Sequence, residues 1–248
     1  MESREIALTF DVENDFNLPS YKGLQIGLPK ILKLLKRFKV PATFFVTGEV
    51  AEKYPTIVQD LGEHFEVGCH GYHHESFQKI DADKKKLLAT AKIILEKTIN
   101  EKVLGFRAPY LRVCQELFLL LQETGFKYDS SLARFNISQR YSTGKIKEFG
   151  LTFPNIFFRF PFGNCVFKTI SILSETPVLY FHPWEAIDIR SLYLTPSLSS
   201  WNFFIRPDRW FNTGSKFISL LSDFVQYHLQ RGFTFKTLQS IYFKTSRS

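Results

Sequence analysis

Cysteine is scarce in this chain of 248 residues, and its three copies, Cys69, Cys114 and Cys165, stand far apart. An odd number of widely spaced cysteines does not make the disulfide framework of a small secreted domain. No uninterrupted apolar stretch approaches the roughly 20 residues that span a bilayer. A strand-like run already begins at Glu5 or Ile6, which leaves no room for the hydrophobic region of a signal peptide. We therefore expect reduced thiols and a cytoplasmic location.

Signatures of nucleic-acid binding are also missing, although the formal net charge is +8. The chain has no basic arm, no RNA-binding aromatic motif and no paired-cysteine zinc finger. Its lysines and arginines are dispersed, with clusters only at residues 30–39 and 84–86. We expect no nucleic-acid partner. Residues 29–38 are compatible with a basic amphipathic helix in peripheral contact with an anionic membrane, or with an outer helix whose basic face is solvated.

Short apolar runs alternate with helical patterns along the whole chain. Strands are predicted at residues 6–12, 42–47, 65–69, 103–107, 126–130, 178–182 and 233–238, and helices at 27–38, 54–61, 82–97, 115–124 and 214–229. This alternation is typical of an α/β fold with a parallel sheet. The length permits one barrel, so we predict a single domain over residues 1–248.

Two aromatic-rich segments interrupt this rhythm. Residues 148–154 and 156–163 are predicted to form extended segments or a hairpin, and a second irregular insertion covers residues 191–210. Insertions of this kind usually cover the active-site face of a domain.

Polar side chains stand where the predicted strands end, namely Asp11, His70, Arg107, Asp129 and His182. The carboxyl ends of parallel barrel strands meet at one rim, and barrel enzymes build their active sites there. We therefore expect these five residues to converge.

His70 and His74 are four residues apart, a spacing that places two imidazoles on one face of a helical turn. Two imidazoles and one carboxylate form a three-ligand site for a divalent metal, most plausibly Zn²⁺, with room for water or substrate. Strand alternation turns Glu13 to the same side as Asp11, which favours Glu13 as the carboxylate. Asp15 is the alternative ligand.

Four ordered motifs carry a family resemblance: Thr9-Phe-Asp11, His70-Gly-Tyr-His-His74, Arg107-Ala-Pro-Tyr110 and Leu179-Tyr-Phe-His182. Together they resemble the motif set of the polysaccharide deacetylases (carbohydrate esterase family 4), over about residues 5–185. The resemblance implies a distorted (β/α) barrel with about seven parallel strands, a divalent metal that is usually zinc, and hydrolysis of an N-acetyl group on an amino sugar.

The resemblance also implies roles for single residues. It assigns Asp11 as catalytic base, His70 and His74 as metal ligands, Arg107 as the partner of the base, the Tyr110 amide as an oxyanion donor, and His182 as general acid. Many members carry the ligand carboxylate directly after the base; in this chain that position is Val12, which cannot coordinate a metal. Other members carry the carboxylate two residues after the base, where this chain has Glu13. By its position at the end of a predicted strand, and apart from the resemblance, Asp129 would hold Arg107 or His182, or would form a turn with the serine that follows it.

The sequence thus predicts a metal-dependent hydrolase that removes N-acetyl groups from an amino-sugar glycan, or from its lipid- or nucleotide-linked precursor. Two alternatives remain open. One is an amidohydrolase or deformylase that acts on a non-polymeric amide. The other, which the Val12 substitution keeps open, is a catalytically silent carbohydrate-binding barrel.

Overall fold

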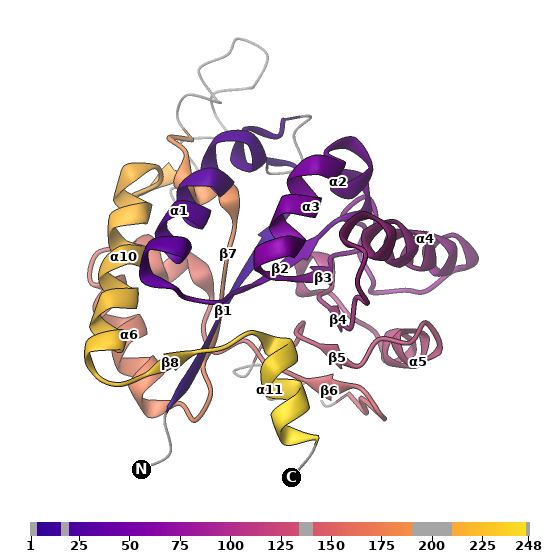
Figure 1. The fold of residues 1–248 in the computed structure, drawn as a ribbon. Coiled ribbons are helices and arrows are strands. Elements are labelled where there is room, and N and C mark those ends of the chain that lie inside the picture. The colour runs from indigo at the N-terminus through magenta and orange to yellow at the C-terminus, as the bar shows by residue number, and fades with distance from the viewer. Residues whose placement is uncertain (1–3, 16–19, 134–140, 190–209, 247–248) are drawn as a thin grey trace.

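A curled parallel sheet forms the centre of the computed structural model, which describes residues 4–15, 20–133, 141–189 and 210–246 (Figure 1). The strand order is β6-β5-β4-β3-β2-β1-β7, with β8 paired to β1, and every strand pair is parallel. The strands are β1 (Glu5–Val12), β2 (Thr43–Val46), β3 (Glu66–Cys69), β4 (Gly105–Phe106), β5 (Tyr128–Asp129), β6 (Lys147–Glu148), β7 (Val178–Phe181) and β8 (Thr234–Phe235). The predicted α/β fold with about seven parallel strands is confirmed.

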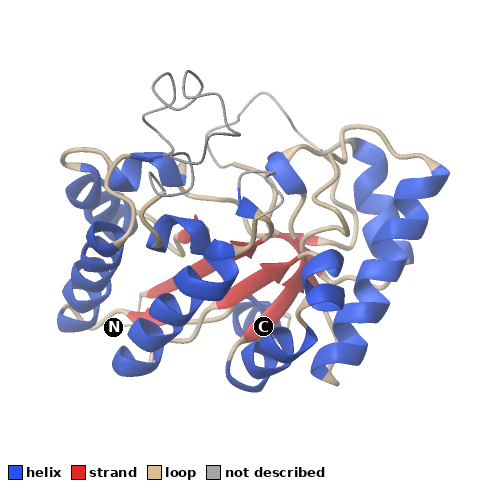
Figure 2. Ribbon diagram, turned by 90° about the horizontal axis from the view of Figure 1, so that it is seen from above, coloured by secondary structure: helices blue, strands red, loops and turns tan. Residues whose placement is uncertain are grey.

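Helices surround this sheet (Figure 2). The α-helices are α1 (Leu28–Phe38), α2 (Gly48–Lys53), α3 (Pro55–His64), α4 (Ala82–Ile99), α5 (Gln115–Glu123), α6 (Gly163–Leu173), α10 (Ser215–Gln230) and α11 (Leu238–Thr245). Shorter helical turns are η2 (Gly23–Gly27), η3 (Pro109–Leu111), η4 (Asn155–Arg159) and η5 (Pro183–Ala186). In α1 the buried leucines and Ile31 recur at helical spacing while the lysines face outward, so the helix covers the sheet with one apolar stripe.

The two ends of the curled sheet meet at one residue. The backbone N–H of Thr152, just after β6, donates to the carbonyl oxygen of Val178 at 3.0 Å. The Val178 N–H donates back to Oγ1 of Thr152 at 2.9 Å. A side chain therefore supplies one of the two hydrogen bonds at this junction.

Helix α11 covers the amino-terminal ends of β2 and β3. The Leu238 N–H donates to Oγ1 of Thr43, and the Gln239 N–H donates to Oε2 of Glu66, both at 3.0 Å. Leu238 and Ile241 belong to the same apolar cluster as Phe45. The end of the barrel opposite to the predicted site is therefore closed by the C-terminal helix.

Several local predictions were wrong. The segment at residues 156–163 is not an extended pair: it holds η4 and leads into α6 at Gly163. A Cβ on Gly163 would lie 1.8 Å from the carbonyl oxygen of Phe157, so the chain doubles back on itself more tightly than a hairpin allows. Phe158 packs into the core, whereas Phe157 and Phe162 are exposed, so the aromatic run does not alternate as a strand would.

Three α-helices, α2, α6 and α11, were not predicted. The expected strand at residues 233–238 is β8 followed by the start of α11, because Oγ1 of Thr237 accepts the Ser240 N–H and caps a helix there. The expected insertion at residues 191–210 lies outside the described residues except for Trp210. Within the described residues, no helix combines the length and the apolar character needed to cross a membrane.

Candidate metal and catalytic site

The carboxyl ends of the strands carry the predicted polar residues. Asp11 is the second-to-last residue of β1, and Asp129 is the last residue of β5. His70 directly follows β3, Arg107 follows β4 and His182 follows β7. Parallel pairing of β1 with β2 and β7, and of β2 with β3, sets these ends side by side. The prediction that they share one rim is confirmed.

Glu13, His70 and His74 form one cluster, in which one ligand atom from each residue lies within 4.8 Å of the others. Oε2 of Glu13 lies 3.6 Å from Nε2 of His70 and contacts Nε2 of His74. The prediction that the two histidines share a helical turn was wrong, since residues 70–74 form a loop. Positive φ angles at Gly71 (73°) and His74 (64°) bend this loop, and the two imidazole centroids end 5.1 Å apart.

The chemistry of this cluster fits a divalent cation. Nδ1 of His70 donates to the carbonyl oxygen of Arg107 at 2.8 Å, so its Nε2 keeps a lone pair directed at Glu13. Oε2 of Glu13 is buried, and among the described residues no group donates a conventional hydrogen bond to it. Burial would raise the pKa of Glu13, but the imidazoles of His70 and His74 outweigh burial and lower the pKa well below its ordinary value. Two imidazole nitrogens and one ionised carboxylate are a donor set that Zn²⁺ prefers.

Asp15, the alternative ligand, is turned away from this cluster. Its Oδ1 accepts the backbone N–H of Gly23 at 2.9 Å, and its Oδ2 accepts the hydroxyl of Ser20 at 2.7 Å. Asp15 thus anchors the loop after β1 to η2. Glu13 is the carboxylate that the fold brings to the two imidazoles.

Asp11 and Arg107 form a buried ion pair beside the cluster. Nη1 of Arg107 donates to Oδ1 of Asp11 at 2.7 Å and to Oγ1 of Thr9 at 2.8 Å. Nε and Nη2 donate to the carbonyl and hydroxyl oxygens of Ser130, each at 2.8 Å. The guanidinium also lies over the ring of Phe45, 4.3 Å from its centroid. These contacts fix the Arg107 fork and, through it, the Asp11 carboxylate.

His182 faces the same space from β7. Its Nε2 is 3.9 Å from Oδ2 of Asp11 and 3.9 Å from Oε1 of Glu13. Burial lowers the pKa of His182, but hydrogen bonding to Glu185 and the negative charges of Glu13 and Asp11 raise it by more. The His182 side chain is partly buried, at 16% exposed, and its Nε2 faces both carboxylates.

Comparison with known proteins agrees with this arrangement. The family model described as "Polysaccharide deacetylase" matches residues 1–128, which is half of the chain. The chain belongs to the polysaccharide deacetylase family. The resemblance drawn from the four motifs is thereby confirmed.

The chain matches only part of the length of its individual relatives. A peptidoglycan deacetylase of Helicobacter pylori is 31% identical over 135 residues, or 53% of this chain and 45% of the relative. A peptidoglycan-N-acetylglucosamine deacetylase of Bacillus cereus is 35% identical over 109 residues, or 44% of this chain and 35% of the relative. The chain thus matches less than half the length of these curated relatives.

Solved structures of the family share the fold. A CE4 family pseudoenzyme from Bacillus anthracis has a TM-score of 0.64 at 16% identity, covering 97% of this chain and 66% of that one. A family 4 carbohydrate esterase from the same organism has a TM-score of 0.58 at 18% identity, covering 96% and 82%. At these identities the likeness establishes the barrel and not the activity.

In this polysaccharide deacetylase family member, the turn that contains Tyr110 lies beside His74 of the cluster. Tyr110 and Leu111 both have positive φ angles, 57° and 56°. The Tyr110 ring centroid is 4.3 Å from that of His74. The Tyr110 side chain therefore packs against His74, and the oxyanion role of the Tyr110 amide stays a prediction.

Asp129 does not lie where the sequence suggested. Its hydrogen bonds among the described residues go to the backbone N–H and hydroxyl of Ser131, at 3.0 and 2.8 Å, and to the carboxyl group of Glu148. The Ser131 hydroxyl oxygen accepts the N–H of Ala108 at 2.7 Å. Asp129 thus supports the backbone next to Arg107 instead of holding the side chain of Arg107 or His182. Burial raises the pKa of Asp129 and, to a greater extent, that of Glu148.

Sequence reasoning missed the residues that surround His182 on its far side, which are Asn155, Arg159 and Glu185. Arg159 and Glu185 form a buried ion pair of 2.6 Å. The His-Pro-Trp-Glu run at residues 182–185 was the available signal for Glu185. Arg159 stands within an aromatic run that has no clear periodicity, so only the fold reveals it.

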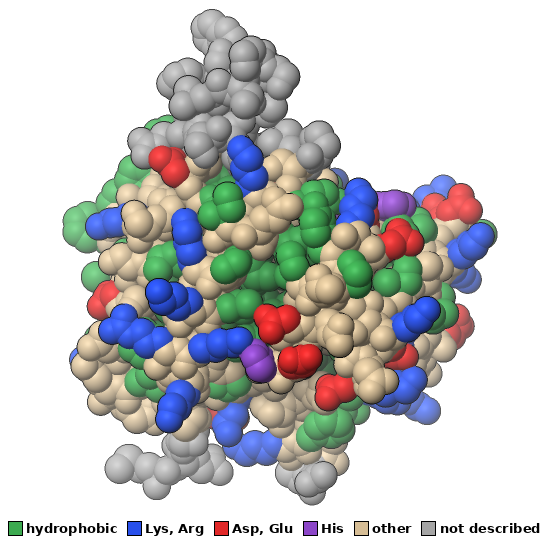
Figure 3. All heavy atoms as spheres, turned by 45° about the horizontal axis from the view of Figure 1, so that its top comes forward, with side chains coloured by type: hydrophobic (Ala, Val, Ile, Leu, Met, Phe, Trp, Pro, Cys, Tyr) green, Lys and Arg blue, Asp and Glu red, His purple; other side chains and the backbone are tan. Residues whose placement is uncertain are grey.

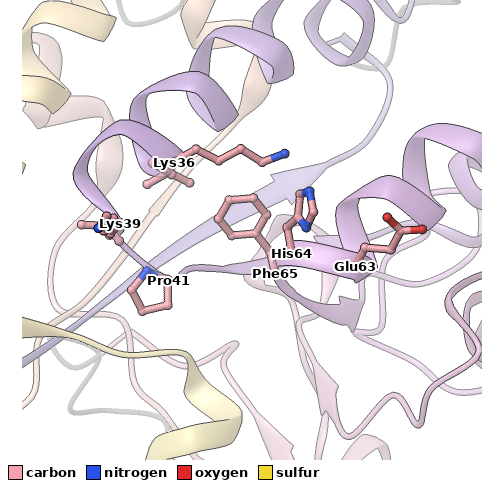
Figure 4. A pocket seen from close by; sticks show the side chains of 8 residues that line it. Lys36, Lys39, Pro41, Glu63, His64 and Phe65 are labelled. Carbon is pink, nitrogen blue, oxygen red and sulfur yellow. The ribbon is translucent and has the colours of Figure 1, made fainter.

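The hollows on another face lie apart from this site. Between α1 and α3 a hollow of about 610 Å³ is lined by Leu28, Leu32 and Ile57, and hydrophobic side chains gather in the middle of the face seen in Figure 3. A second hollow, of about 520 Å³, has Lys36, Lys39, Pro41, Glu63, His64 and Phe65 around it (Figure 4). The residues that line the second hollow precede β2 and β3 in the chain, so this hollow lies at the end of the barrel opposite to the rim. Acidic side chains on α3 stand across both hollows from the lysines of α1. The peripheral contact with an anionic membrane that the basic residues of α1 suggested stays a prediction.

Proposed function

We propose that this chain is a zinc-dependent deacetylase that hydrolyses the N-acetyl group of an amino sugar in a glycan. One observation carries the proposal: Oδ2 of Asp11 and Nε2 of His182 face each other at 3.9 Å beside the Glu13, His70 and His74 cluster. A base and an acid on either side of a three-ligand site suit hydrolysis of an amide. The relatives named as peptidoglycan deacetylases support an N-acetylated amino sugar as the substrate.

Glu13, His70 and His74 would hold the metal. A bound Zn²⁺ supplies Lewis-acid chemistry, because it lowers the pKa of water towards about 7 and polarises an acyl carbonyl. The ligands leave coordination positions for water and substrate, since the protein offers three donors where zinc takes four or five.

Asp11 accepts a proton from the attacking water at Oδ2. Its other oxygen is occupied by Arg107, so only Oδ2 is directed at the reaction space. The buried guanidinium compensates the negative charge of the carboxylate before the reaction and prevents its rotation.

The backbone N–H of Tyr110 would donate to the oxygen that becomes negative as the carbonyl carbon turns tetrahedral. His182, protonated at Nε2, then gives its proton to the amine nitrogen of the sugar as the C–N bond breaks. The products are acetate and a free amino sugar. The raised pKa of His182, caused by hydrogen bonding to Glu185 and by the charges of Glu13 and Asp11 against the effect of burial, keeps this proton in place near neutral pH.

The experiment is a metal analysis of purified protein paired with an assay of acyl release. The panel holds N-acetylglucosamine oligomers, peptidoglycan fragments, nucleotide-linked and lipid-linked N-acetyl sugars, and the N-formyl counterparts of each. We expect about one zinc per chain and acetate release that is abolished by chelation and restored by zinc. Release of formate alone would indicate a deformylase. Tight glycan binding without metal and without acetate would indicate a silent binding barrel and refute the proposal.

The panel also addresses the form of the substrate. The net charge of +8 favours a substrate that carries phosphate, which a lipid- or nucleotide-linked precursor does and an uncharged oligomer does not. We expect higher kcat/KM on the phosphate-linked sugars, with a preference that weakens as salt concentration rises. A preference for the finished polymer at every salt concentration would exclude the precursor.

A further inference from the structure

Glu185 lies directly behind His182, on the side away from Asp11. Its side chain is completely buried. Oε1 accepts the backbone N–H of His182 at 2.9 Å and lies 3.4 Å from Nδ1 of the same residue. One carboxylate oxygen thus contacts both the backbone and the ring of His182.

Two further side chains hold this carboxylate. Asn155 donates from Nδ2 to Oε1 at 3.0 Å, and Arg159 donates from Nε to Oε2 at 2.6 Å. Arg159 is itself anchored, since its Nη1 donates to the carbonyl oxygen of Phe211 at 2.7 Å and its own carbonyl accepts from Asn212 at 2.6 Å. Glu185 is therefore supplied with donors on both oxygens and has little freedom to rotate.

The ring of His182 is also held from one face. Trp184 stacks on it with ring centroids 5.1 Å apart and an angle of 24° between the planes. The guanidinium of Arg159 in turn lies over the Trp184 ring, 5.4 Å from its centroid. The plane of the imidazole is set by Trp184, and Glu185 contacts the edge that bears Nδ1.

We infer that Glu185 is the positioning residue of His182: the Nδ1–H of the imidazole donates to Oε1 of Glu185, which directs Nε2 at Asp11 and the departing amine. This role, which the sequence suggested for Asp129, rests on the proposed function of His182 as general acid. Nδ2 of Asn155 also lies 3.3 Å from Nδ1 of His182, so the competing arrangement is a bare Nδ1 that accepts from Asn155. The two arrangements differ in whether Nδ1 of His182 carries a proton.

Two double variants separate positioning from simple structural support. Arg159→Met with Glu185→Gln removes the ion pair but keeps an amide oxygen at the place of Oε1. Arg159→Met with Glu185→Leu removes the ion pair and the acceptor together. Both variants replace a buried charge pair by uncharged side chains, a change that folded proteins commonly tolerate.

We expect the two double variants to differ in kcat, while the zinc content stays unchanged and KM nearly unchanged. The Gln variant loses less than about tenfold in kcat, while the Leu variant loses about 100-fold, the range found when a hydrogen-bonded orienting group is removed. Equal kcat in the two variants would overturn the inference, because only the acceptor distinguishes them. A loss in the Leu variant that appears only in KM would overturn it as well.

A spectroscopic measurement tests the same inference without any activity. Protein labelled with ¹⁵N at histidine has six imidazoles, and His182→Gln identifies the signals of His182 by their disappearance. We expect a proton on Nδ1 of His182 in the native protein and a mixture of tautomers in the Leu variant. A bare Nδ1 in the native protein would refute the inference. If the native protein releases no acyl group but shows this proton, the proposed function fails while the contact between Glu185 and His182 stands.

Discussion

Nη1 of Arg107 donates a 2.7 Å hydrogen bond to Oδ1 of Asp11, across a sequence separation of 96 residues. The pair is buried, with the Arg107 side chain 0% and the Asp11 side chain 4% exposed. Because Arg107 occupies one carboxylate oxygen, the other faces His182. A single ion pair thus decides which atom of Asp11 is available as a base, and the first three predictions concern this pair and the adjoining ligands.

Asp11→Asn should keep the metal and lose turnover. The amide oxygen still accepts from Arg107, so the fold and the ligand cluster stay intact, but the amide nitrogen cannot take a proton from water. We expect kcat to fall by about 10²–10⁴ with unchanged zinc content. The measurement is initial-rate acetate release together with metal analysis. Asp15→Asn is the matched control, since Asp15 is also buried after β1 but bonds Ser20 and Gly23. An undiminished rate in Asp11→Asn would overturn the assignment of the base.

Glu13→Gln should weaken zinc binding, because a neutral amide replaces the only carboxylate of the cluster. We expect metal affinity to fall by at least about tenfold, measured by competition with a chromogenic chelator. His74→Ala should lose both the metal and activity. His73→Ala is the control: its side chain is 57% exposed and pairs with Glu49 rather than with the cluster. If His73→Ala lost metal as readily as Glu13→Gln, the ligand set would have to be revised.

Arg107→Met should destabilise the fold by about 3–5 kcal/mol, because Asp11 loses the guanidinium that compensates its buried charge. Urea denaturation at pH 7 measures the free energy of unfolding. Adding Asp11→Asn to Arg107→Met should recover part of the loss, since the unpaired charge is removed. Arg112→Met, at an exposed arginine in the following turn, should change the free energy of unfolding by less than about 0.5 kcal/mol. Strictly additive losses in the double variant would contradict the ion-pair account.

Glu66 should make the stability of the protein depend on pH. Burial raises the pKa of this carboxyl group from an ordinary 4.5 to about 7, although hydrogen bonds from the backbone of Gln239 and from Thr43 oppose the rise. Between these two pH values the folded protein keeps a proton that the unfolded chain has lost. The contribution of Glu66 to stability is therefore greatest below pH 4.5 and is lost as the pH rises through 7.

Glu66→Gln should abolish this dependence. Relative to the native protein, the variant should gain about 2–3 kcal/mol of unfolding free energy between pH 5 and pH 8. Urea denaturation at the two pH values measures the difference, in which the other titrating groups cancel. Glu63→Gln, at an exposed neighbour, should leave the pH dependence of the native protein unchanged. The same pH dependence in Glu66→Gln as in the native protein would show that Glu66 is ionised throughout.

Much of the strand framework was predictable because its signal is local. A strand such as β1 is a mostly apolar run, interrupted by Thr9 and Asp11, and it is buried along almost its whole length. Strand lengths were less accurate: the runs at residues 103–107 and 126–130 contain only the two-residue strands β4 and β5. The number of paired residues depends on the neighbouring strands, and no local pattern encodes the neighbours.

Helix α6 shows a different limit. The run before it is rich in phenylalanine, which suits strands and buried helices equally, so composition could not separate the two. The tight approach of Gly163 to the backbone of Phe157 decides the outcome. That approach is a tertiary contact.

The sequence by itself determined the chemistry available at the rim. Asp11, His70 and His182 each follow an apolar strand run, and the carboxyl ends of parallel strands converge whatever the details of packing. Only the tertiary structure chose Glu13 over Asp15, because the path of the chain after β1 ties Asp15 to Ser20 and Gly23. The tertiary structure alone also set Arg159 against Glu185, 26 residues apart in sequence, behind His182. Side-chain identities specify which groups can react, whereas long-range packing decides which of them meet.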